Sequence, residues 1–216
     1  ALSESSLTHG GAMATNDVDG DGSPDLVVPF AGSAHEIVLF RNIGWNASFP
    51  LAHRSVLALP LDSGPHAVAV GDVTGDGLLD LAFSLFESNH VGVAVASPGD
   101  LLGMASGAYI VIADAYLAPA ELKLGFIDED NVLDIVVPWV VSDIVTWYSG
   151  SANLSAVVNA HRIVAPVVDH PRHIALGDVD LDGDVDVLIS SLSEDLISFR
   201  RNDGSGSFAE RIAIID

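Results

Sequence analysis

The sequence predicts an all-β protein, a β-propeller of four four-stranded blades. Three observations point to this fold. An Asp-rich loop followed by a short apolar strand recurs four times, the loops open at residues 17, 72, 126 and 178 in steps of 55, 54 and 52, and β-branched and aromatic residues dominate the segments between the loops. A period of this size indicates stacked copies of one supersecondary unit. Four short strands in each unit are the pattern of a propeller blade.

Each predicted blade runs from an inner strand through the Asp loop to three further strands. The inner strands alternate small and larger apolar residues, as expected beside a narrow central channel, and they cover 12–15, 67–70, 121–124 and 173–176. Glu121 and Lys123 interrupt this alternation and are expected to pair along the channel wall. The third strands recur in register at 37–40, 91–94, 144–147 and 197–200. The chain is therefore interpreted as one domain, 1–216, with approximate blades at 1–56, 57–112, 113–164 and 165–216.

The repeat alone leaves the closure of the ring open. One blade cannot bury both of its faces, so neighbouring blades must stack around an axis. Four complete blades make a closed four-bladed ring the simplest arrangement. The alternatives are half of an eight-bladed ring that is closed by dimerisation, and a fragment of a longer propeller.

The charge and composition exclude several classes of partner. Eight Lys and Arg against 30 Asp and Glu give a formal net charge of −22, and there is no cysteine. Such a chain repels nucleic-acid phosphates and anionic membranes, which need clustered cations. No apolar run approaches the roughly 20 residues that cross a bilayer, so no membrane insertion is expected. Stability must come from core burial and metal binding, because disulfides are absent.

The four Asp loops predict calcium sites. Side chains at loop positions 1, 3, 5 and 9, with the carbonyl of position 7, can supply the six to eight oxygens that Ca²⁺ requires. The predicted ligands are Asp17, Asp19, Asp21, Ser23 and Asp25 in loop one; Asp72, Thr74, Asp76, Leu78 and Asp80 in loop two; Asp128, Asp130, Val132 and Asp134 in loop three; and Asp178, Asp180, Asp182, Asp184 and Asp186 in loop four.

Loop three is expected to bind most weakly, since Phe126 replaces the opening Asp and Asn131 replaces Gly. An EF-hand is excluded, because the position of its closing Glu falls in strand-like runs, at Val28, Phe83, Val137 and Ile189. Metal-free Asp turns remain the alternative for any single loop.

The repeated motif resembles a known family. The pattern G-D-[VI]-x-x-D-G-x-x-D-[LVI], with a downstream I-x-[WF]-[YR]-x-[ND]-G-x-G-x-F segment, is similar to FG-GAP/VCBS-type repeats, and the copy from Gly177 to Asp216 matches best. The resemblance covers essentially the whole chain, although loop three departs from it and no clear FG or GAP signature accompanies the blades. It implies a calcium-binding β-propeller, as in the integrin α-subunit head and certain fungal lectins. It also implies an extracellular or cell-surface location and a role in recognition, adhesion or carbohydrate binding.

A partner surface is predicted on the face opposite the Asp loops. Polar residues stand just before or at the start of the inner strands, and their hydrogen-bonding groups suit a polar ligand such as a sugar; they are His9, His66, Glu121, His170, Arg172 and His173. Loop residues without a ligand are the alternative interpretation. Two sequons, at Asn46 and Asn153, are compatible with a secreted glycoprotein.

No catalytic motif is visible, neither a Gly-x-Ser-x-Gly elbow nor a Cys nucleophile nor HExxH. The expected function is therefore a non-enzymatic recognition or adhesion module with a protein or glycan ligand. The alternatives are a self-associating structural subunit of an extracellular assembly, and a non-catalytic accessory domain of a polysaccharide-active enzyme.

Overall fold

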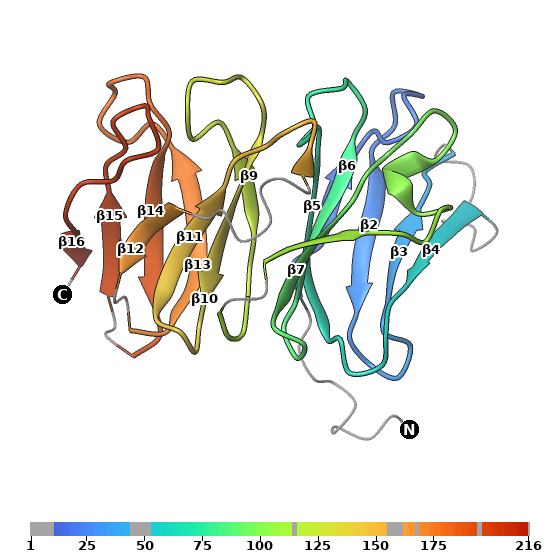
Figure 1. Ribbon diagram of the computed structural model, residues 1–216, viewed down its shortest axis with the longest axis horizontal. Coiled ribbons are helices and arrows are strands. Elements are labelled where there is room, and N and C mark those ends of the chain that lie inside the picture. The colour runs from blue at the N-terminus through green and yellow to red at the C-terminus, as the bar shows by residue number, and fades with distance from the viewer. Residues whose placement is uncertain are drawn as a thin grey trace.

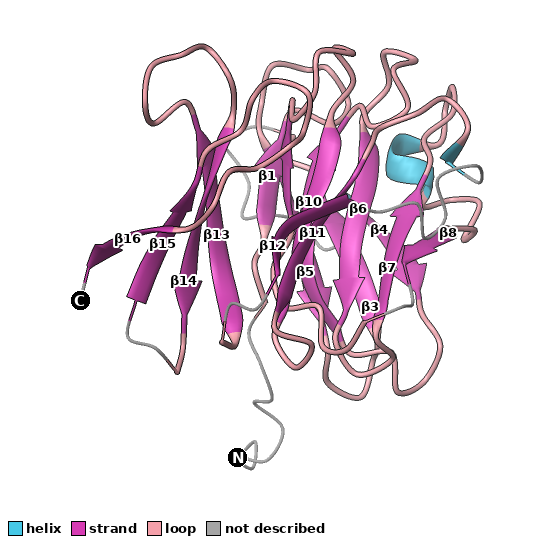
Figure 2. Cartoon of the chain, turned by 60° about the vertical axis from the view of Figure 1, so that its left-hand side comes forward, coloured by secondary structure: helices cyan, strands magenta, loops and turns pink. Residues whose placement is uncertain are grey.

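A computed structural model describes residues 11–43, 53–113, 116–154, 162–166, 169–193 and 196–215. Within these ranges the chain forms four antiparallel sheets of four strands each, with a single short 3₁₀ turn at Leu101–Gly103 (Figures 1 and 2). The predicted all-β fold of four four-stranded blades is confirmed. In the described part of the chain, no helix is long and apolar enough to cross a membrane.

Each sheet takes its four strands in chain order, every strand beside the next. Sheet 1 contains β1 (Ala14–Asn16), β2 (Asp25–Phe30), β3 (Glu36–Phe40) and β4 (Arg54–Ala58). Sheet 2 contains β5 (Pro65–Gly71), β6 (Asp80–Leu85), β7 (His90–Ala94) and β8 (Ile110–Ala113). Sheet 3 contains β9 (Lys123–Gly125), β10 (Asp134–Trp139), β11 (Ile144–Tyr148) and β12 (Arg162–Pro166). Sheet 4 contains β13 (Pro171–Gly177), β14 (Asp186–Ser191), β15 (Leu196–Arg200) and β16 (Ile212–Ile215).

The predicted third strands correspond to β3, β7, β11 and β15, which differ from them by one residue at most at each end. The approximate blade boundaries at 56, 112 and 164 fall inside β4, β8 and β12, so these sheets end slightly later than the repeat suggests. The difference arises because the period follows the Asp loops, whereas the outer strand ends where its pairing with the third strand stops.

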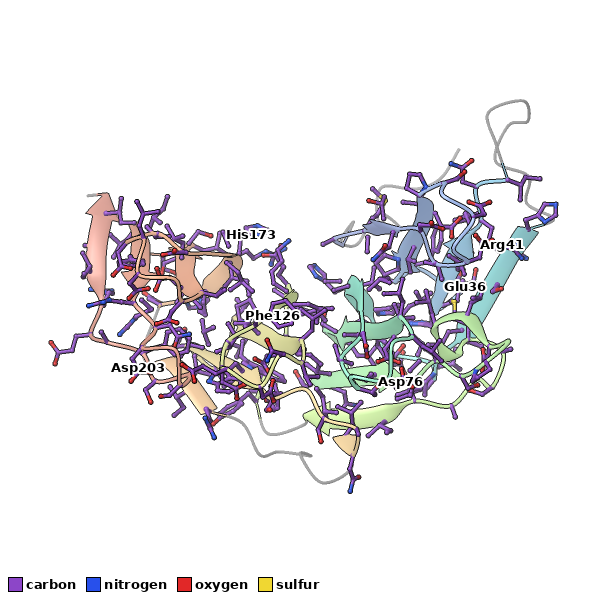
Figure 3. The ribbon with its side chains drawn as sticks, turned by 90° about the horizontal axis from the view of Figure 1, so that it is seen from above. Glu36, Arg41, Asp76, Phe126, His173 and Asp203 are labelled. Atoms are coloured by element: carbon purple, nitrogen blue, oxygen red, sulfur yellow. The ribbon has the colours of Figure 1, made fainter. Side chains whose placement is uncertain are left out.

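The four sheets stand in an arc. Sheet 1 contacts β5 through β1 and β2, β5 contacts β9, and β13 contacts β9 and β10. The inner strands meet directly at one point, where the Val68 N–H donates to the Ala12 carbonyl at 3.1 Å. Seen from above, the first and last sheets lie at the two ends of the arc, with an open side between them (Figure 3). In the described ranges these two sheets share no strand contact of the kind that joins neighbours, which leaves the simplest closed ring unformed.

Three large apolar clusters hold the sheets together, one in each gap between neighbours, and a smaller fourth cluster lies around Ala120 and Val140. Phe83 fills the gap between sheets 1 and 2, Trp139 the next and Trp147 the last, and each is fully buried. Full burial of such side chains contributes about 1.5–3 kcal/mol each. Both indole N–H groups are satisfied, by Thr146 Oγ1 at 2.8 Å and by the Gly206 carbonyl at 3.1 Å. The apolar faces of the sheets therefore determine the arc.

Candidate functional site

The Asp loops join the first strand of each sheet to the second, so all four lie on the same face of the arc, at the top of Figure 1. Each loop ends on a buried Asp that opens the second strand, at positions 25, 80, 134 and 186. In sheet 1, Asp25 Oδ2 accepts the Val18 N–H at 3.0 Å, and Oδ1 accepts the Asn42 N–H at 2.7 Å. The same two connections recur at Asp80, Asp134 and Asp186. This Asp, here called the clamping Asp, therefore ties the loop to the second residue after the third strand.

The Asp that opens a loop curls it. Asp17 accepts the amides of Asp21 at 3.0 Å and Gly22 at 2.8 Å. Asp72 and Asp178 accept the amides at the equivalent positions of loops two and four. Gly22 has φ of 87°, a left-handed conformation that glycine adopts without a steric cost. In loop three, Phe126 cannot accept these bonds and its side chain is 51% exposed.

Carboxylate oxygens converge in three of the four loops. In each group the oxygens lie within 4.8 Å of one another, a spacing that one hard cation with oxygen ligands can bridge. The groups are Asp17, Asp19 and Asp25; Asp128, Asp130 and Asp134; and Asp178, Asp180 and Asp186. Loop two, whose residues are all described, brings no such trio together, because Thr74 replaces the third-position Asp and its hydroxyl donates to Asp80 at 3.2 Å.

The fifth-position side chains have a local role. Asp21, Asp76 and Asp182 each accept the amide two residues further on, at 2.8, 2.9 and 3.1 Å, and Asp130 does the same in loop three at 2.8 Å. These bonds fix the second half of each loop. The carbonyls at Ser23, Leu78, Val132 and Asp184 stay predicted ligands.

Two arginines reach the Asp loops, and sequence reasoning missed both. Arg41 Nε and Nη2 each lie 2.8 Å from Asp19 Oδ2. Arg201 lies 2.6 Å from Asp180 Oδ2 and 2.7 Å from Asp182 Oδ2. Each arginine stands directly before the residue whose amide the clamping Asp accepts. Only the first and fourth repeats have an Arg at this position, and this is the one feature of the sequence that could have predicted the two contacts.

Loop three has a different electrostatic environment. Burial raises the pKa of Asp134 to about 6, although its oxygens accept the amides of Gly150 and Ile127. Burial also raises the pKa of Asp128, and the charge of Arg162 opposes this shift only weakly. In loop four, the hydrogen bond from Arg201 lowers the pKa of Asp182, while burial raises the pKa of Asp180 and that of Asp184. Among the described residues, no ion pair compensates the carboxylates of loop three, in contrast with those of loop four.

A pocket of about 230 Å³ lies on the inner side of the arc, away from the Asp loops. It takes residues from all four sheets or the segments that lead into them. The lining is Gly11, Ala12, His66, Ala120, Glu121, Arg172 and His173. Figure 3 shows His173 at the inner side of sheet 4, towards the open side of the arc. The structure thus brings together four of the six residues predicted to bind a ligand. We call this the axial pocket.

The polar groups of the axial pocket are held in place by neighbouring sheets. His66 is buried and its Nδ1 donates to the Ala120 carbonyl at 2.5 Å. Glu121 accepts the Ile174 N–H at 2.9 Å and pairs with Lys123 Nζ at 3.0 Å. The predicted pairing of Glu121 with Lys123 is therefore present. Arg172 makes no ion pair or hydrogen bond to another residue of the described ranges.

Two predicted ligand residues stand outside the pocket. His170 has φ of 53° and lies in a separate exposed cluster, 2.6 Å from Asp169 and 3.6 Å from Asp143. This backbone turn separates it from Arg172, two residues later. His9 lies outside the described residues, as does the sequon at Asn46. Asn153 lies in an exposed turn, with its N–H donated to Ser151 Oγ.

Comparison with known proteins supports the fold. Residues 17–83 match the model of a family described as FG-GAP-like repeat, which confirms the expected resemblance over that segment. No curated protein matches the chain.

Similar solved structures include virginiamycin B lyase from Staphylococcus aureus, with 13% identity and a TM-score of 0.59 over 94% of this chain and 54% of that one. BBS1N in complex with ARL6DN has 16% identity and a TM-score of 0.55 over 97% and 56%. The V. cholerae biofilm matrix protein Bap1 has 15% identity and a TM-score of 0.53 over 94% and 30%. These chains share the propeller-type fold, and this chain spans little more than half of their length or less.

Proposed function

We propose that this chain is a calcium-stabilised, extracellular or cell-surface recognition module that binds a protein or glycan ligand at the axial pocket. The observation that carries the proposal is the pocket itself, since all four sheets or their leading segments contribute to it. The Asp loops lie on the opposite face of the arc, so metal binding and ligand binding would not compete for the same surface. No catalytic activity is part of the proposal.

The chemistry of the Asp loops supports calcium. All donors are oxygens, and three loops bring three carboxylates within 4.8 Å. Ca²⁺ would be held by the side chains of those trios and would neutralise charge that is otherwise packed densely. Because the bound ion belongs to the folded state alone, it adds about 2.7 kcal/mol per site at a concentration roughly 100 times its dissociation constant.

Thermal unfolding in EDTA, and then in millimolar calcium, tests this part. We expect a calcium-dependent rise in melting temperature, and magnesium at equal concentration serves as the control for a general ionic effect. An unchanged melting temperature would show that the Asp loops are turns held by hydrogen bonds alone.

The polar lining supports a ligand with an acidic group. Lys123 already balances Glu121, whereas Arg172 has no partner among the described residues and stands beside two histidines. In a chain with a formal charge of −22, this is a locally basic site. An arginine binds a carboxylate or sulfate through paired hydrogen bonds. Uronic or sulfated sugars and acidic peptide side chains carry such groups.

Two comparisons support the setting. BBS1N was solved with a protein partner, ARL6DN, so this fold accommodates protein ligands. Bap1 is a biofilm matrix protein, which favours an extracellular module. The similarity to virginiamycin B lyase extends to the fold alone, and the expected absence of catalysis stays a prediction that a turnover assay on the isolated chain can test.

Binding to an array of neutral, uronic and sulfated glycans tests the ligand. We expect saturable binding to acidic glycans that falls about tenfold or more in Arg172→Ala, since a lost charged hydrogen-bond pair costs at least the equivalent of that factor. Binding should persist in Arg54→Ala, an arginine on the outer strand β4. Acidic peptides form the second arm. Equal binding by both variants, or no saturable binding in either arm, would refute the axial pocket as the recognition site.

A further inference from the structure

Two junctions between neighbouring sheets are joined by equivalent hydrogen bonds on the face away from the Asp loops. Between sheets 2 and 3, the Ala118 N–H donates to Asn89 Oδ1 at 2.8 Å, a contact here called the neutral latch. Between sheets 3 and 4, the His170 N–H donates to Asp143 Oδ1 at 2.9 Å, here called the charged latch. Both acceptors stand directly before a third strand, β7 or β11, and all four residues have φ between 53° and 62°. The two latches therefore share position and backbone conformation and differ in their side chains.

Each latch holds a segment that leads into the axial pocket. In both sheets a proline follows the latched residue, Pro119 or Pro171, and the next residue, Ala120 or Arg172, lines the pocket. The proline ring fixes φ at about −65°, so little of a shift in the latched residue can be absorbed before the pocket is reached. The charged latch thus helps to set where Arg172 stands relative to the pocket residues of sheets 2 and 3.

The charged latch contains two carboxylates from different sheets with one imidazole between them. His170 Nδ1 lies 2.6 Å from Asp169 Oδ1 and 3.6 Å from Asp143 Oδ1, the same oxygen that accepts the His170 N–H. All three ligand-type atoms lie within 4.8 Å of one another. A protonated imidazole offsets the repulsion between the two carboxylates, whereas a neutral one leaves two like charges facing each other across the junction. The neutral latch has no ionisable side chain and cannot respond in this way.

The other groups around His170 do not replace its charge. Ser193 Oγ, in the turn between β14 and β15, lies 3.2 Å from His170 Nδ1 and carries no charge. In the described ranges the two carboxylates form ion pairs with His170 alone, and Arg172 lines the axial pocket instead. Glu194 and Asp195 follow Ser193 in the sequence and lie outside the described residues.

We propose that protonation of His170 closes the charged latch, and that deprotonation loosens it and lets Arg172 move relative to the rest of the axial pocket. The effect on the pocket rests on the proposed function, whereas the latch itself does not. The hydrogen bond with Asp169 raises the pKa of His170 above 6.5, with the charges of the two carboxylates adding to it and desolvation opposing it. Because the folded-state pKa is raised, the stabilisation is fully present below pH 6.5 and is lost as pH rises through the raised value.

Amide exchange with solvent, followed residue by residue by NMR at a fixed calcium concentration, tests the latch. The Ala118 and His170 N–H groups report the two latches in the same sample. The range runs from about pH 5.5 to about pH 8.5, on both sides of the ordinary histidine pKa. After correction for the intrinsic rate, protection of the His170 amide should fall with rising pH by up to about fivefold, the range for exposed ion pairs. Protection of the Ala118 amide should stay constant.

Asp143→Asn makes the test specific, because it gives the charged latch the acceptor of the neutral one. The variant keeps an oxygen for the His170 N–H and removes one of the two carboxylates, so the pH dependence of the His170 amide should become much smaller. His53→Gln is the control, since His53 is exposed directly before β4 in sheet 1 and should leave that dependence unchanged. A pH-independent His170 amide in the unaltered chain, or an undiminished dependence in Asp143→Asn, would overturn the proposal.

Binding of a sulfated glycan at both ends of this pH range tests the effect on the pocket. The sulfate stays ionised throughout, and any contribution of the pocket histidines is common to both proteins. Affinity should therefore fall less steeply with rising pH in Asp143→Asn than in the unaltered chain. Equal slopes would refute the effect of the latch on Arg172. If neither the sulfated glycan nor an acidic peptide binds at either pH, the proposed function fails and the effect on the pocket fails with it, while the exchange result still decides the latch.

Discussion

Loops one and four differ from loops two and three in how their negative charge is balanced. Arg41 and Arg201 contact the carboxylates of the first pair at 2.6–2.8 Å. At the same structural position the second pair has Val95 and Ser149, and in the described ranges no arginine forms an ion pair with Asp72–Asp80 or Asp128–Asp134. An arginine supplies the positive charge that a cation would otherwise provide. The loops richest in Asp are therefore the ones in which an arginine would compete with the proposed calcium ion.

This difference changes the ranking of the sites. Counting ligands alone places loops one and four first and loop three last. An ion pair between arginine and Asp, however, must break or share its carboxylate oxygens before calcium can bind them fully. Exposed ion pairs of this kind contribute about 0.2–1 kcal/mol. Loop three lacks the opening Asp, and among the described residues no arginine forms an ion pair with its carboxylates, although the charge of Arg162 acts weakly on Asp128. At the proposed calcium sites, affinity is therefore expected to depend both on the number of ligands and on the arginine, and substitutions can separate the two.

The largest effect is expected from Asp134→Ala in calcium-free buffer. Asp134 is inaccessible to solvent and accepts the amides of Ile127, Asp128 and Gly150 at 2.8, 3.3 and 2.9 Å. Leaving these donors unpaired should lower the free energy of unfolding by about 3 kcal/mol. Asp19→Ala removes the partner of the half-buried Arg41, at 2.8 Å, and a weaker acceptor of the Asp21 amide, at 3.3 Å, and should cost less, about 1 kcal/mol. Urea unfolding measures both, and equal losses would contradict the clamping role of the buried Asp.

The second prediction concerns pH and distinguishes loop three from loop four. Burial raises the pKa of Asp134 from 3.8 to about 6, so between these values the folded chain holds a proton that the unfolded chain has released. The stability that this group contributes in EDTA therefore falls as pH rises through that window. Asp182 behaves in the opposite sense, because the hydrogen bond from Arg201 lowers its pKa; its contribution is present above 3.8 and is lost as pH falls through the lowered value.

Carboxyl-carbon NMR titration in calcium-free buffer checks this contrast. The midpoint for Asp134 should lie near pH 6 and that for Asp182 below 3.8. Addition of calcium should move the Asp134 midpoint downwards, because a bound cation favours the ionised form. Coincident midpoints for the two residues would show that burial and Arg201 do not differentiate the loops.

A smaller effect is expected from Arg41→Gln and Arg201→Gln. Removing either arginine frees Asp19, or Asp180 and Asp182, for metal, so calcium affinity should rise by up to about fivefold, the equivalent of about 1 kcal/mol. Isothermal titration with calcium measures the change. Arg172→Gln is the control, because Arg172 lines the axial pocket, away from the Asp loops. Unchanged or weakened calcium binding in both variants would mean that the arginines assist the site instead of competing for it.

The period and alternation of the sequence were sufficient to predict the sheets and the common end of the Asp loops. They also placed His66, Glu121, Arg172 and His173 at equivalent starts of inner strands, and these four side chains do line one pocket. The arginine contacts were not predicted, because Arg41 is 22 residues from Asp19 and meets it only through the pairing of β2 with β3.

Other features depend on geometry that a pattern does not encode. His170 is close to Arg172 in sequence, yet a left-handed turn directs it to Asp143 and Asp169. The clamping Asp was predicted as a metal ligand, but its two backbone connections follow from the strand register. The angle between neighbouring sheets is set by side-chain packing, so closure of the ring was left open by the repeat and is an arc in the structure.

The smallest expected effect comes from giving loop three the arginine that it lacks. Ser149 stands directly before Gly150, whose amide Asp134 accepts, which is the position of Arg41 and Arg201 in their own sheets. Ser149→Arg should stabilise the calcium-free protein by a few tenths of a kcal/mol, roughly the value of an exposed ion pair, and should weaken the calcium response of loop three about twofold. Ser149→Gln has a long side chain without the charge and controls for bulk. Should both variants respond to calcium alike, charge at this position would not govern the loop, and the difference between the two pairs of loops would have to arise from the opening Asp instead.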